Sequence, residues 1–512
     1  MIGLDGCAYD LVSPWIKSGH LPNLARLIEK GAYGYLVSTI PSHSAPAWTS
    51  LTTGVNPGKH GIFDFLRRDT SVVTASNIKN PRLWTILSAH GFRCCVVNVP
   101  VTYPPDRIDG VVISGFPTPL ARNDYAHPSS VLGLLEKTKY LVDAPILLQM
   151  PLYENYDRGA VLKEECLVAE RRAKTVLELL QSEWDFVFVV FKECDDLQHL
   201  FWDKPDVLLE FYKKLDAYIG SIEEAFRARA PEDDVYIFVV SDHGFGPGPT
   251  SLFDLRGWIM LNTMMKSTFS SFSAAINELS AKLLTTPILG HSLGLDIVKF
   301  YQSISPGRVA LFIEKLAKFV RDLRIGTPAF LVLHNGIYVN SSAFKTRQEF
   351  ESFISELLEK LPKIEAKSKR VFNRIWKRED LYTGTRLDQL PELVYTTHSE
   401  FITCKGPFLG FQTPLTGAHF DCPNGTLIIS GSNVNHQRVE ANVYQITPTI
   451  LNLFGISYSD QFDGAALQDV FANRLKAPET PKQLESMQQE SMTLTLDEES
   501  VVKERLRRLG YL

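Results

Sequence analysis

Two polar residues, Asp242 and His243, directly follow a buried stretch of the chain. Residues 235–240 are β-branched, aromatic and aliphatic, a run typical of a strand that is buried on both faces. In open α/β sheets, ligands collect beyond the carboxyl ends of the strands. A carboxylate beside an imidazole at such a place suits a divalent metal ion such as zinc. Taken alone, the pair is equally well explained by a capping aspartate and a core histidine.

The same ligand types recur at other expected strand ends. Asp195 and His199 follow residues 186–191, another apolar run, and a helical turn that begins at Asp195 would place both on one face. Asp5 stands at the end of a short N-terminal strand, and His419 lies in a polar loop. The alternative for each of these residues is a helix cap or a polar residue of the core. The number of such residues at strand ends favours a metal centre.

Ser44 is the candidate nucleophile. It lies in a proline-containing turn, residues 41–48, between a strand expected at 34–40 and a helix expected at 49–53 with its end at Gly54. A hydroxyl at a strand-to-helix turn lies near the positive end of the helix, where phosphate binds readily. The alternative is a helix-capping serine.

Together these side chains offer three carboxylates, three imidazoles and one hydroxyl. This is enough for two metal sites that share a nucleophile. Two divalent ions about 4 Å apart can stabilise the attacking and the leaving oxygen of an in-line phosphoryl displacement. One ion would lower the pKa of the nucleophilic hydroxyl, and the other would neutralise charge on the leaving oxygen.

The elements that must position these residues alternate between helix and strand. This alternation predicts an α/β fold with a mostly parallel central sheet and helices on both faces. Besides the elements above, we expect helices at 22–31 (Pro22 at its start, Gly31 at its end), 162–181, 348–361 and 444–454, and strands at 94–99, 336–340, 392–395 and 426–430.

Changes in composition divide the chain into four parts. We expect a first part of the catalytic core at 1–250, a helical insertion at 251–330, a second part of the core at 331–474, and a charged linker with a C-terminal amphipathic helix at 475–512. That helix, from Leu496 to Leu512, would carry Val501, Val502, Leu506 and Leu509 on one side.

Composition excludes several classes of protein. The 512 residues are 45% hydrophobic and 22% charged, as in soluble enzymes, and a net charge of −5 gives no case for nucleic-acid binding. Seven cysteines without a CxxC pair favour a reducing compartment, and no apolar run is long enough for a transmembrane helix. The sequence shows no signal peptide, so the expected location is cytoplasmic. Only four residues precede Asp5, so the alternative is that residues are missing before Met1 and that a targeting segment lies among them.

The ordered motifs resemble the alkaline phosphatase superfamily, in its type I phosphodiesterase/nucleotide pyrophosphatase branch. They run in family order from residue 3 to about residue 465. The matching segments are residues 3–6, 44–54, 57–61, Asp195 with His199, residues 241–244, 417–419, and 447–451 followed by Gly455.

The resemblance implies an alkaline-phosphatase-like three-layer sandwich and a phosphodiesterase that acts through a phosphoserine at Ser44. It implies two divalent ions, zinc or alternatively manganese, and a small phosphoester substrate, with nucleotides among the candidates. Asp195, His199 and His419 would hold one ion. Asp5, Asp242 and His243 would hold the other, which would also contact Ser44.

Two departures from the family pattern bear on the substrate. Nucleotide pyrophosphatases usually carry threonine at the position of Ser44, and an asparagine that touches a phosphate oxygen; no asparagine stands close to Ser44 here. Another donor must therefore stabilise the equatorial oxygens, and Lys192 is a candidate; its alternative is an exposed lysine at a strand end. Trp48 and Phe65 could stack on a base or pack in the core.

Related activities are the competing interpretations. A sulfatase needs an arginine that the segment after Ser44 lacks, and a phosphomutase needs a large second domain for which residues 65–184 are short. A phosphomonoesterase would use the same metal ions and nucleophile. A catalytically inactive scaffold would have lost ligands, and none is lost here. The sequence does not predict the natural substrate or the oligomeric state.

Overall fold

The computed structural model describes most of the chain. The described residues are 1–119, 122–146, 157–230, 235–259, 262–263, 285–287, 329–333, 335–366, 368–403, 416–419, 421–456, 461–473 and 494–508. The chain forms two compact units. The first consists of Met1–Gly248, Leu381–Leu390 and Leu415–Leu512, and the second of Pro249–Asp380 and Pro391–Pro414.

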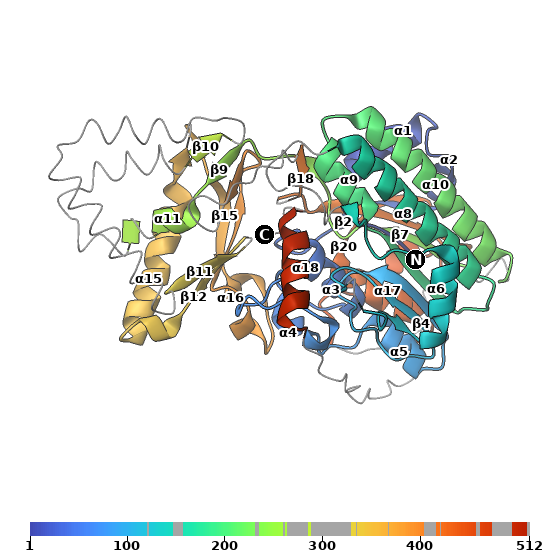
Figure 1. Ribbon diagram of the computed structural model, residues 1–512, viewed down its shortest axis with the longest axis horizontal. Coiled ribbons are helices and arrows are strands. Elements are labelled where there is room, and N and C mark those ends of the chain that lie inside the picture. Colours follow the sequence, from blue (N-terminus) through green and yellow to red (C-terminus); the bar gives the residue numbers. More distant parts are fainter. Residues whose placement is uncertain are drawn as a thin grey trace. The chain divides into compact units, whose positions relative to one another are not determined.

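The first unit is built on a mixed sheet that has nine strands within the described residues (Figure 1). Their spatial order is β20 (Gln437–Asn442), β2 (Gly31–Val37), β19 (Asn424–Ser430), β7 (Ile237–Val240), β1 (Ile2–Leu4), β6 (Phe186–Phe191), β3 (Cys94–Val99), β4 (Gly110–Ser114) and β5 (Ala126–His127). Strand β19 is antiparallel to both of its neighbours, and β5 is antiparallel to β4. The remaining neighbours pair in parallel, so the sheet is mostly parallel, as predicted.

Helices cover both faces of this sheet and complete a three-layer α/β sandwich (Figure 1). On one face lie α3 (Ser44–Thr53), α5 (Leu83–Ala89) and α17 (Ile446–Leu453). On the other lie α1 (Tyr9–Lys17), α2 (Pro22–Glu29), α8 (Arg158–Leu179) and α10 (Pro205–Arg227). The unit also contains α4 (Pro57–His60), α6 (Leu132–Thr138) and α9 (Glu193–Phe201). A buried core cluster joins Trp48, Trp84 and Ile450 of the helices to Phe188 and Val240 of the sheet.

Several predicted elements are confirmed, and two need correction. Strands β3 and β6 have the predicted limits. Gly31 does not end a helix: it is the first residue of β2, where a Cβ atom would lie 2.0 Å from the carbonyl oxygen of Ile429 on β19. Helix α3 begins at Ser44 rather than Thr49, because Pro46 lies in the first helical turn, where its missing N–H is tolerated.

The second unit has its own antiparallel sheet of four strands within the described residues. The strands are, in order, β11 (Phe330–Leu333), β12 (Gly336–Val339), β16 (Leu393–Thr397) and β15 (Phe372–Lys377). Other elements are α11 (Leu255–Ile259), α15 (Arg347–Lys360), α16 (Arg378–Leu381), and the short strands β9 (Ser251–Phe253), β10 (Thr285–Pro287), β13 (Glu365–Ala366), β14 (Lys369–Arg370) and β17 (Phe401–Thr403). Its core includes Leu255, Ile337, Leu357 and Tyr395.

The two units therefore divide the chain differently from the expected parts. The second unit begins at Pro249, close to the expected boundary, but it continues beyond residue 330 to Asp380. The strands expected at 336–340 and 392–395 pair with each other and not with the central sheet. Much of 251–330 lies outside the described residues, and the described part holds strands β9 and β10 besides helix α11, so it is not purely helical.

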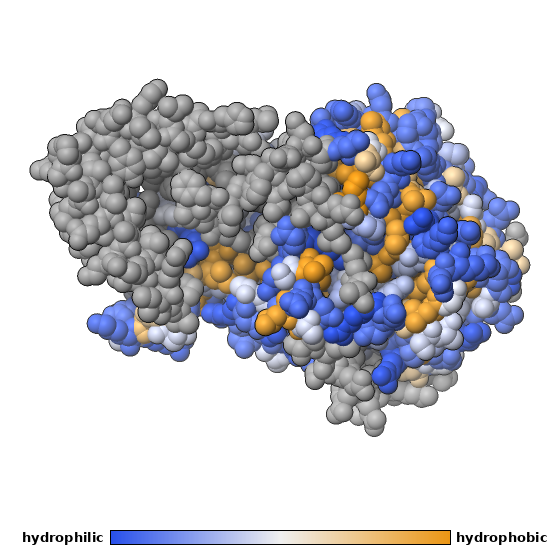
Figure 2. Space-filling model, viewed as in Figure 1, coloured by the Kyte–Doolittle hydropathy of each residue, from blue (hydrophilic) through white to orange (hydrophobic). Residues whose placement is uncertain are grey.

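The predicted C-terminal helix is present as α18 (Leu496–Arg508) and packs against the first unit. Val502 and Leu506 are buried, as expected, whereas Val501 is 46% exposed because one residue turns the chain by about 100°. Leu509 lies outside the described residues, as does the expected linker up to residue 493. On the face shown in Figure 2, hydrophilic residues surround small hydrophobic areas. No helix among the described residues is long and apolar enough to cross a membrane.

Candidate active site

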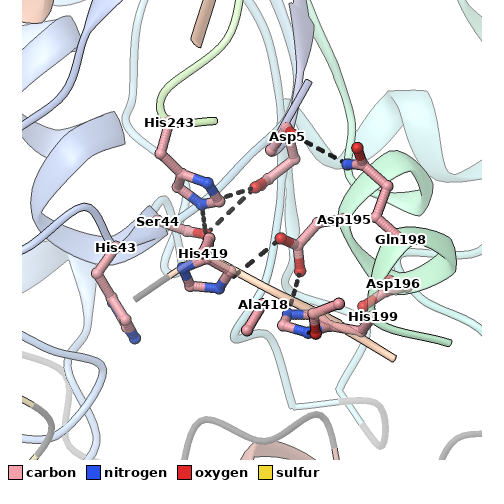
Figure 3. A network of polar contacts seen from close by, with 12 residues as sticks. Asp5, His43, Ser44, Asp195, Asp196, Gln198, His199, His243, Ala418 and His419 are labelled. Atoms are coloured by element: carbon pink, nitrogen blue, oxygen red, sulfur yellow. Dashed lines mark hydrogen bonds and ion pairs between the residues drawn. The ribbon is translucent and has the colours of Figure 1, made fainter. Parts of the chain in front are cut away.

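The predicted ligands meet at one edge of the sheet in the first unit (Figure 3). Strands β1, β6 and β7 are adjacent and parallel, so their carboxyl ends lie together. Asp5 follows β1, Asp242 and His243 follow β7, and α9 begins just after β6. The structure therefore brings these groups together beyond the carboxyl ends of the strands, which is where they were predicted to lie.

The first ligand group consists of Asp5, Asp242 and His243, which each offer an atom within 4.8 Å of the others. The Nε2 atom of His243 lies 3.3 Å from Asp242 Oδ2 and 3.6 Å from Asp5 Oδ1. The hydroxyl of Ser44 lies 3.1 Å from the same Nε2 atom and 3.2 Å from Asp5 Oδ1. Ser44 thus shares its surroundings with this group.

The second group consists of Asp195, His199 and His419, whose ligand atoms also lie within 4.8 Å of one another. Asp195 and His199 are one turn apart on α9, and their Oδ2 and Nε2 atoms are 3.3 Å apart. His419 follows β18 (Gly417–Ala418), which pairs with β8 (Gly246–Pro247), and its Nε2 lies 3.8 Å from Asp195 Oδ1. Its ring stacks on that of His243 with centroids 4.1 Å apart, so the two groups are neighbours.

The three histidines are oriented alike by the backbone. Each places Nδ1 within hydrogen-bond distance of a carbonyl oxygen, which can only accept, so Nδ1 donates. The pairs are His199 with Gly417 (3.0 Å), His243 with Gly244 (2.9 Å) and His419 with Ser42 (3.0 Å). A neutral imidazole bound in this way keeps the lone pair of Nε2 for a metal ion.

Trp48 is a supporting residue whose role the sequence did not reveal. Its indole is fully buried in the core, and Nε1 donates a hydrogen bond to Asp5 Oδ2 at 2.9 Å. Phe65 is also buried. The spacing could have suggested this contact, because Trp48 stands one helical turn after Ser44.

Gly6 makes the close approach of the two groups possible. Its φ angle is +65°, in the left-handed region that favours glycine. A Cβ atom here would lie 2.9 Å from Asp195 Oδ1 and 3.3 Å from His243 Cε1. The backbone N–H of Gly6 also donates to Asp242 Oδ1 at 3.2 Å.

Burial makes this site electrostatically costly without a cation. Burial raises the pKa of Asp5 well above its ordinary value, and the carboxylates of Asp242 and Asp195 add to the effect. Burial also raises the pKa of Asp242, whose Oδ2 has no hydrogen-bond donor among the described residues. Burial acts in the same direction on Asp195, but His199 and His419 outweigh it and lower its pKa.

The donor set fits divalent metal ions. Carboxylate oxygens and neutral imidazole nitrogens are ligands of zinc, and manganese accepts the same atoms. A cation between buried carboxylates would offset the desolvation and repulsion that raise the pKa of Asp5 and Asp242.

Lys192 is not brought to Ser44. Its ammonium contacts both oxygens of Asp196 at 2.5 and 2.6 Å, and it lies 3.9 Å from Asp143. Asp143, Glu165 and Asp196 form a third group of neighbouring carboxylates, and the ammonium of Lys192 already serves it as a cation.

His43 is a further residue that sequence reasoning missed, although it directly precedes Ser44. It is buried, its Nε2 lies 3.7 Å from Asp64 Oδ1, and its ring centroid is 5.9 Å from that of His419 (Figure 3). A fourth imidazole therefore borders the site, next to His419.

Comparisons with known proteins identify the family of the chain. The sequence profile of a family described as type I phosphodiesterase / nucleotide pyrophosphatase matches residues 1–407. This range contains all the predicted ligands except His419, which the structure places beside Asp195 and His199. No curated protein matches the chain in sequence.

Solved structures show the same fold at low sequence identity. Phosphonoacetate hydrolase from Sinorhizobium meliloti, in complex with phosphonoacetate, is 14% identical, with a TM-score of 0.53 over 87% of this chain and 93% of that one. An inactive murine ectonucleotide pyrophosphatase/phosphodiesterase 5 in complex with AMP is 11% identical, with a TM-score of 0.54 over 92% and 99%. The human counterpart is 12% identical, with a TM-score of 0.53 over 92% and 100%.

Proposed function

Since the chain belongs to the type I phosphodiesterase/nucleotide pyrophosphatase family, we propose that it hydrolyses phosphoesters at two divalent metal ions with Ser44 as the nucleophile. The observation that carries this proposal is the position of the Ser44 hydroxyl. It lies 3.2 Å from a carboxylate oxygen and 3.1 Å from an imidazole nitrogen of one ligand group. The second ligand group adjoins through stacked imidazoles.

Each ligand group would hold one ion. Asp5, Asp242 and His243, with Ser44, would hold the first, and Asp195, His199 and His419 the second. When bound, the two ions supply charge that lowers the pKa of a nucleophilic hydroxyl and neutralises oxygens that become negative during phosphoryl transfer. Zinc fits the imidazole-rich donor set, and manganese is the alternative.

Ser44 and its helix would carry out the displacement. The Ser44 oxygen loses its proton and bonds to phosphorus, while the bond from phosphorus to the leaving ester oxygen breaks. Water then attacks the same phosphorus and releases Ser44. Since Ser44 is the first residue of α3, the positive end of this helix would lie near the phosphoryl oxygens and favour their negative charge.

The substrate class follows from the family, and we propose a phosphodiester, with nucleotides included. One relative of this fold was solved in complex with AMP and another with phosphonoacetate. Since Lys192 is engaged by Asp196, we do not assign it to the substrate. A monoester substrate would use the same ligands and the same nucleophile, so an assay has to separate the two.

The test combines metal content with turnover. The purified chain is analysed for zinc and manganese, and hydrolysis of bis-p-nitrophenyl phosphate is compared with that of p-nitrophenyl phosphate. Two ions per chain and a preference for the diester are expected. Ser44→Ala should abolish turnover and retain the ions. The matched control is Ser50→Ala, which removes a buried hydroxyl of the same helix that bonds to His60.

The outcomes separate the alternatives. A strong preference for the monoester would identify a phosphatase. A chain without turnover of either compound, even after zinc or manganese is added, would contradict the proposal and leave a non-catalytic protein with this fold.

A further inference from the structure

A second cluster of charges is buried next to α9, outside the ligand groups. We call it the charge cluster. Each of its seven residues is at most 4% exposed: Asp143, Glu165, Arg172, Lys192, Glu193, Asp196 and Arg505. Arg505 comes from the C-terminal helix α18, 362 residues after its partner Asp143.

The contacts run from α18 to the first turn of α9. Arg505 forms an ion pair with Asp143 and donates from Nη1 to the carbonyl oxygen of Thr118 at 3.0 Å. Asp143 lies 3.9 Å from the Lys192 ammonium, which in turn holds Asp196 at 2.5 and 2.6 Å.

One aromatic ring lies against both cations of this chain of contacts. The guanidinium of Arg505 and the ammonium of Lys192 lie 5.0 and 5.2 Å from the ring centroid of Phe116. Contact with an aromatic ring favours a cation over a neutral group at both positions.

The charge cluster already has more carboxylates than cations. Four carboxylates face three cations, and one of these cations, Arg172, pairs with Glu193. Neither oxygen of Glu165 has a hydrogen-bond partner among the described residues, and burial together with Asp196 and Asp143 raises its pKa. Burial alone would lower the pKa of Lys192, but Asp143 and Asp196 raise it, so the ammonium stays charged.

Loss of Arg505 would place two carboxylates in competition for Lys192. Asp143 would lose its ion pair with Arg505 and keep only Lys192 at 3.9 Å, and breaking a buried ion pair is costly. The ammonium, now shared between Asp143 and Asp196, would be drawn away from Asp196.

Asp196 and Lys192 flank a metal ligand. Asp195 directly precedes Asp196, and the backbone N–H of Asp195 donates to the carbonyl oxygen of Lys192 at 2.9 Å. Movement of this turn would displace Asp195 and also His199, which lies one turn later. These two residues provide two of the three ligand atoms of one ligand group.

We propose that Arg505 is a positioning residue for the metal group of Asp195, His199 and His419, and that it acts through Asp143 and Lys192. The C-terminal helix is thereby a functional support of the active site and not a peripheral appendage. This inference rests on the proposed function, since it presupposes that this group binds a metal ion.

The test uses the full chain and cobalt(II), whose visible absorption reports on ligand geometry. Metal-free protein is titrated with cobalt, and kcat and KM are measured separately for the diester. Arg505→Met should weaken binding at one of the two sites by about tenfold or more, the range found when supporting residues of metal ligands are replaced. Its kcat should fall while KM changes little, because Arg505 does not reach the substrate.

Two further variants separate positioning from mere stability. Asp143→Asn combined with Arg505→Met removes the competing carboxylate, so Lys192 returns to Asp196 and cobalt binding should recover to near the wild-type level. Glu498→Gln removes an ion pair of the same helix with Arg122, outside the charge cluster, and should leave cobalt binding unchanged.

Specific results would overturn this inference. Wild-type cobalt affinity and spectrum in Arg505→Met would do so, even if that variant unfolds at a lower temperature. A double variant that binds cobalt no better than the single variant would also overturn it. If the single variant does not fold, weakened cobalt binding by the double variant decides against the inference. Failure of the wild type to bind two ions would instead contradict the proposed function.

Discussion

The indole of Trp48 donates a hydrogen bond to Oδ2 of Asp5 at 2.9 Å, while Oδ1 of the same carboxylate faces Ser44 and His243. One oxygen is therefore held by the core, and the other is directed into the site. Trp48 lies on the helix that begins with Ser44, so a single helix positions the proposed nucleophile and orients a proposed metal ligand.

Trp48→Phe should weaken metal binding without removing a ligand. The aromatic core contact is largely kept, but Asp5 loses the donor that fixes its orientation. We expect metal affinity to fall by about 10–100-fold, as for other residues that support metal ligands. Calorimetric titration of metal-free protein with zinc measures the change.

The matched control is Trp84→Phe. Trp84 is equally buried and donates from Nε1 to Asp106 Oδ2 at 2.7 Å, away from the ligands. This variant should lose about 1–3 kcal/mol of stability and keep the wild-type zinc affinity. Equal zinc affinities in both variants and the wild type would show that the Trp48 bond does not orient a ligand.

Gly6→Ala should disrupt the metal centre. The new Cβ would lie 2.9 Å from Asp195 Oδ1, and φ at this position is +65°. Gly19→Ala is the control, because φ there is +78° with no atom within 4 Å, so only the backbone cost of about 1 kcal/mol applies. Zinc stoichiometry should fall in the first variant only; full zinc occupancy in Gly6→Ala would contradict the described geometry.

Stability should decrease in acid partly through His60. Its Nδ1 accepts the N–H of Ile62 at 3.0 Å and its Nε2 lies 2.9 Å from Ser50 Oγ, so the ring is held neutral. Burial, with a smaller contribution from Arg386, lowers the pKa of His60 from 6.5 to about 3. Between these values the unfolded chain binds a proton that the folded chain does not, so stability falls as pH decreases, by up to about 1.4 kcal/mol per pH unit.

Urea unfolding at several pH values between 7 and 4 measures this contribution. His60→Gln should be less stable than the wild type at pH 7 but should lose less stability on acidification. Parallel pH dependences in the two proteins would show that His60 does not contribute in this way.

Removal of metal ions should destabilise the first unit and abolish turnover. Burial, together with repulsion from neighbouring carboxylates, raises the pKa of Asp5 and Asp242, and a chelator would remove the cations that offset this cost. Zinc at 100 times its dissociation constant should restore about 2.7 kcal/mol. Ser44→Ala should show a similar zinc-dependent rise in melting temperature; a melting temperature that is independent of zinc in both would argue against bound ions.

Much of the first unit could be predicted from the sequence because its signals are local. The apolar runs of β3 and β6 define buried strands without knowledge of their neighbours. The second unit could not be separated, because β12 and β16 resemble strands of the main sheet and only their pairing shows otherwise. Pairing between segments more than 50 residues apart leaves no local pattern.

The ligand groups could be predicted because parallel strand ends converge, which applies to Asp5, Asp195 and Asp242 alike. The residues that support these ligands could not be predicted. Nothing in the sequence near Arg505 indicates that it is buried, since its partner Asp143 lies 362 residues earlier. Lys192 was a candidate for the substrate from its position at a strand end, but that position does not reveal Asp196 as its partner.

The stereochemical course at phosphorus shows whether Ser44 attacks the substrate. A phosphorothioate diester that is chiral at phosphorus is hydrolysed in isotopically labelled water, and the configuration of the product is determined. Attack by Ser44 followed by attack of water requires two in-line displacements, so we expect overall retention, with no turnover by Ser44→Ala. Inversion would show that water attacks the substrate directly and would contradict the assignment of Ser44 as the nucleophile.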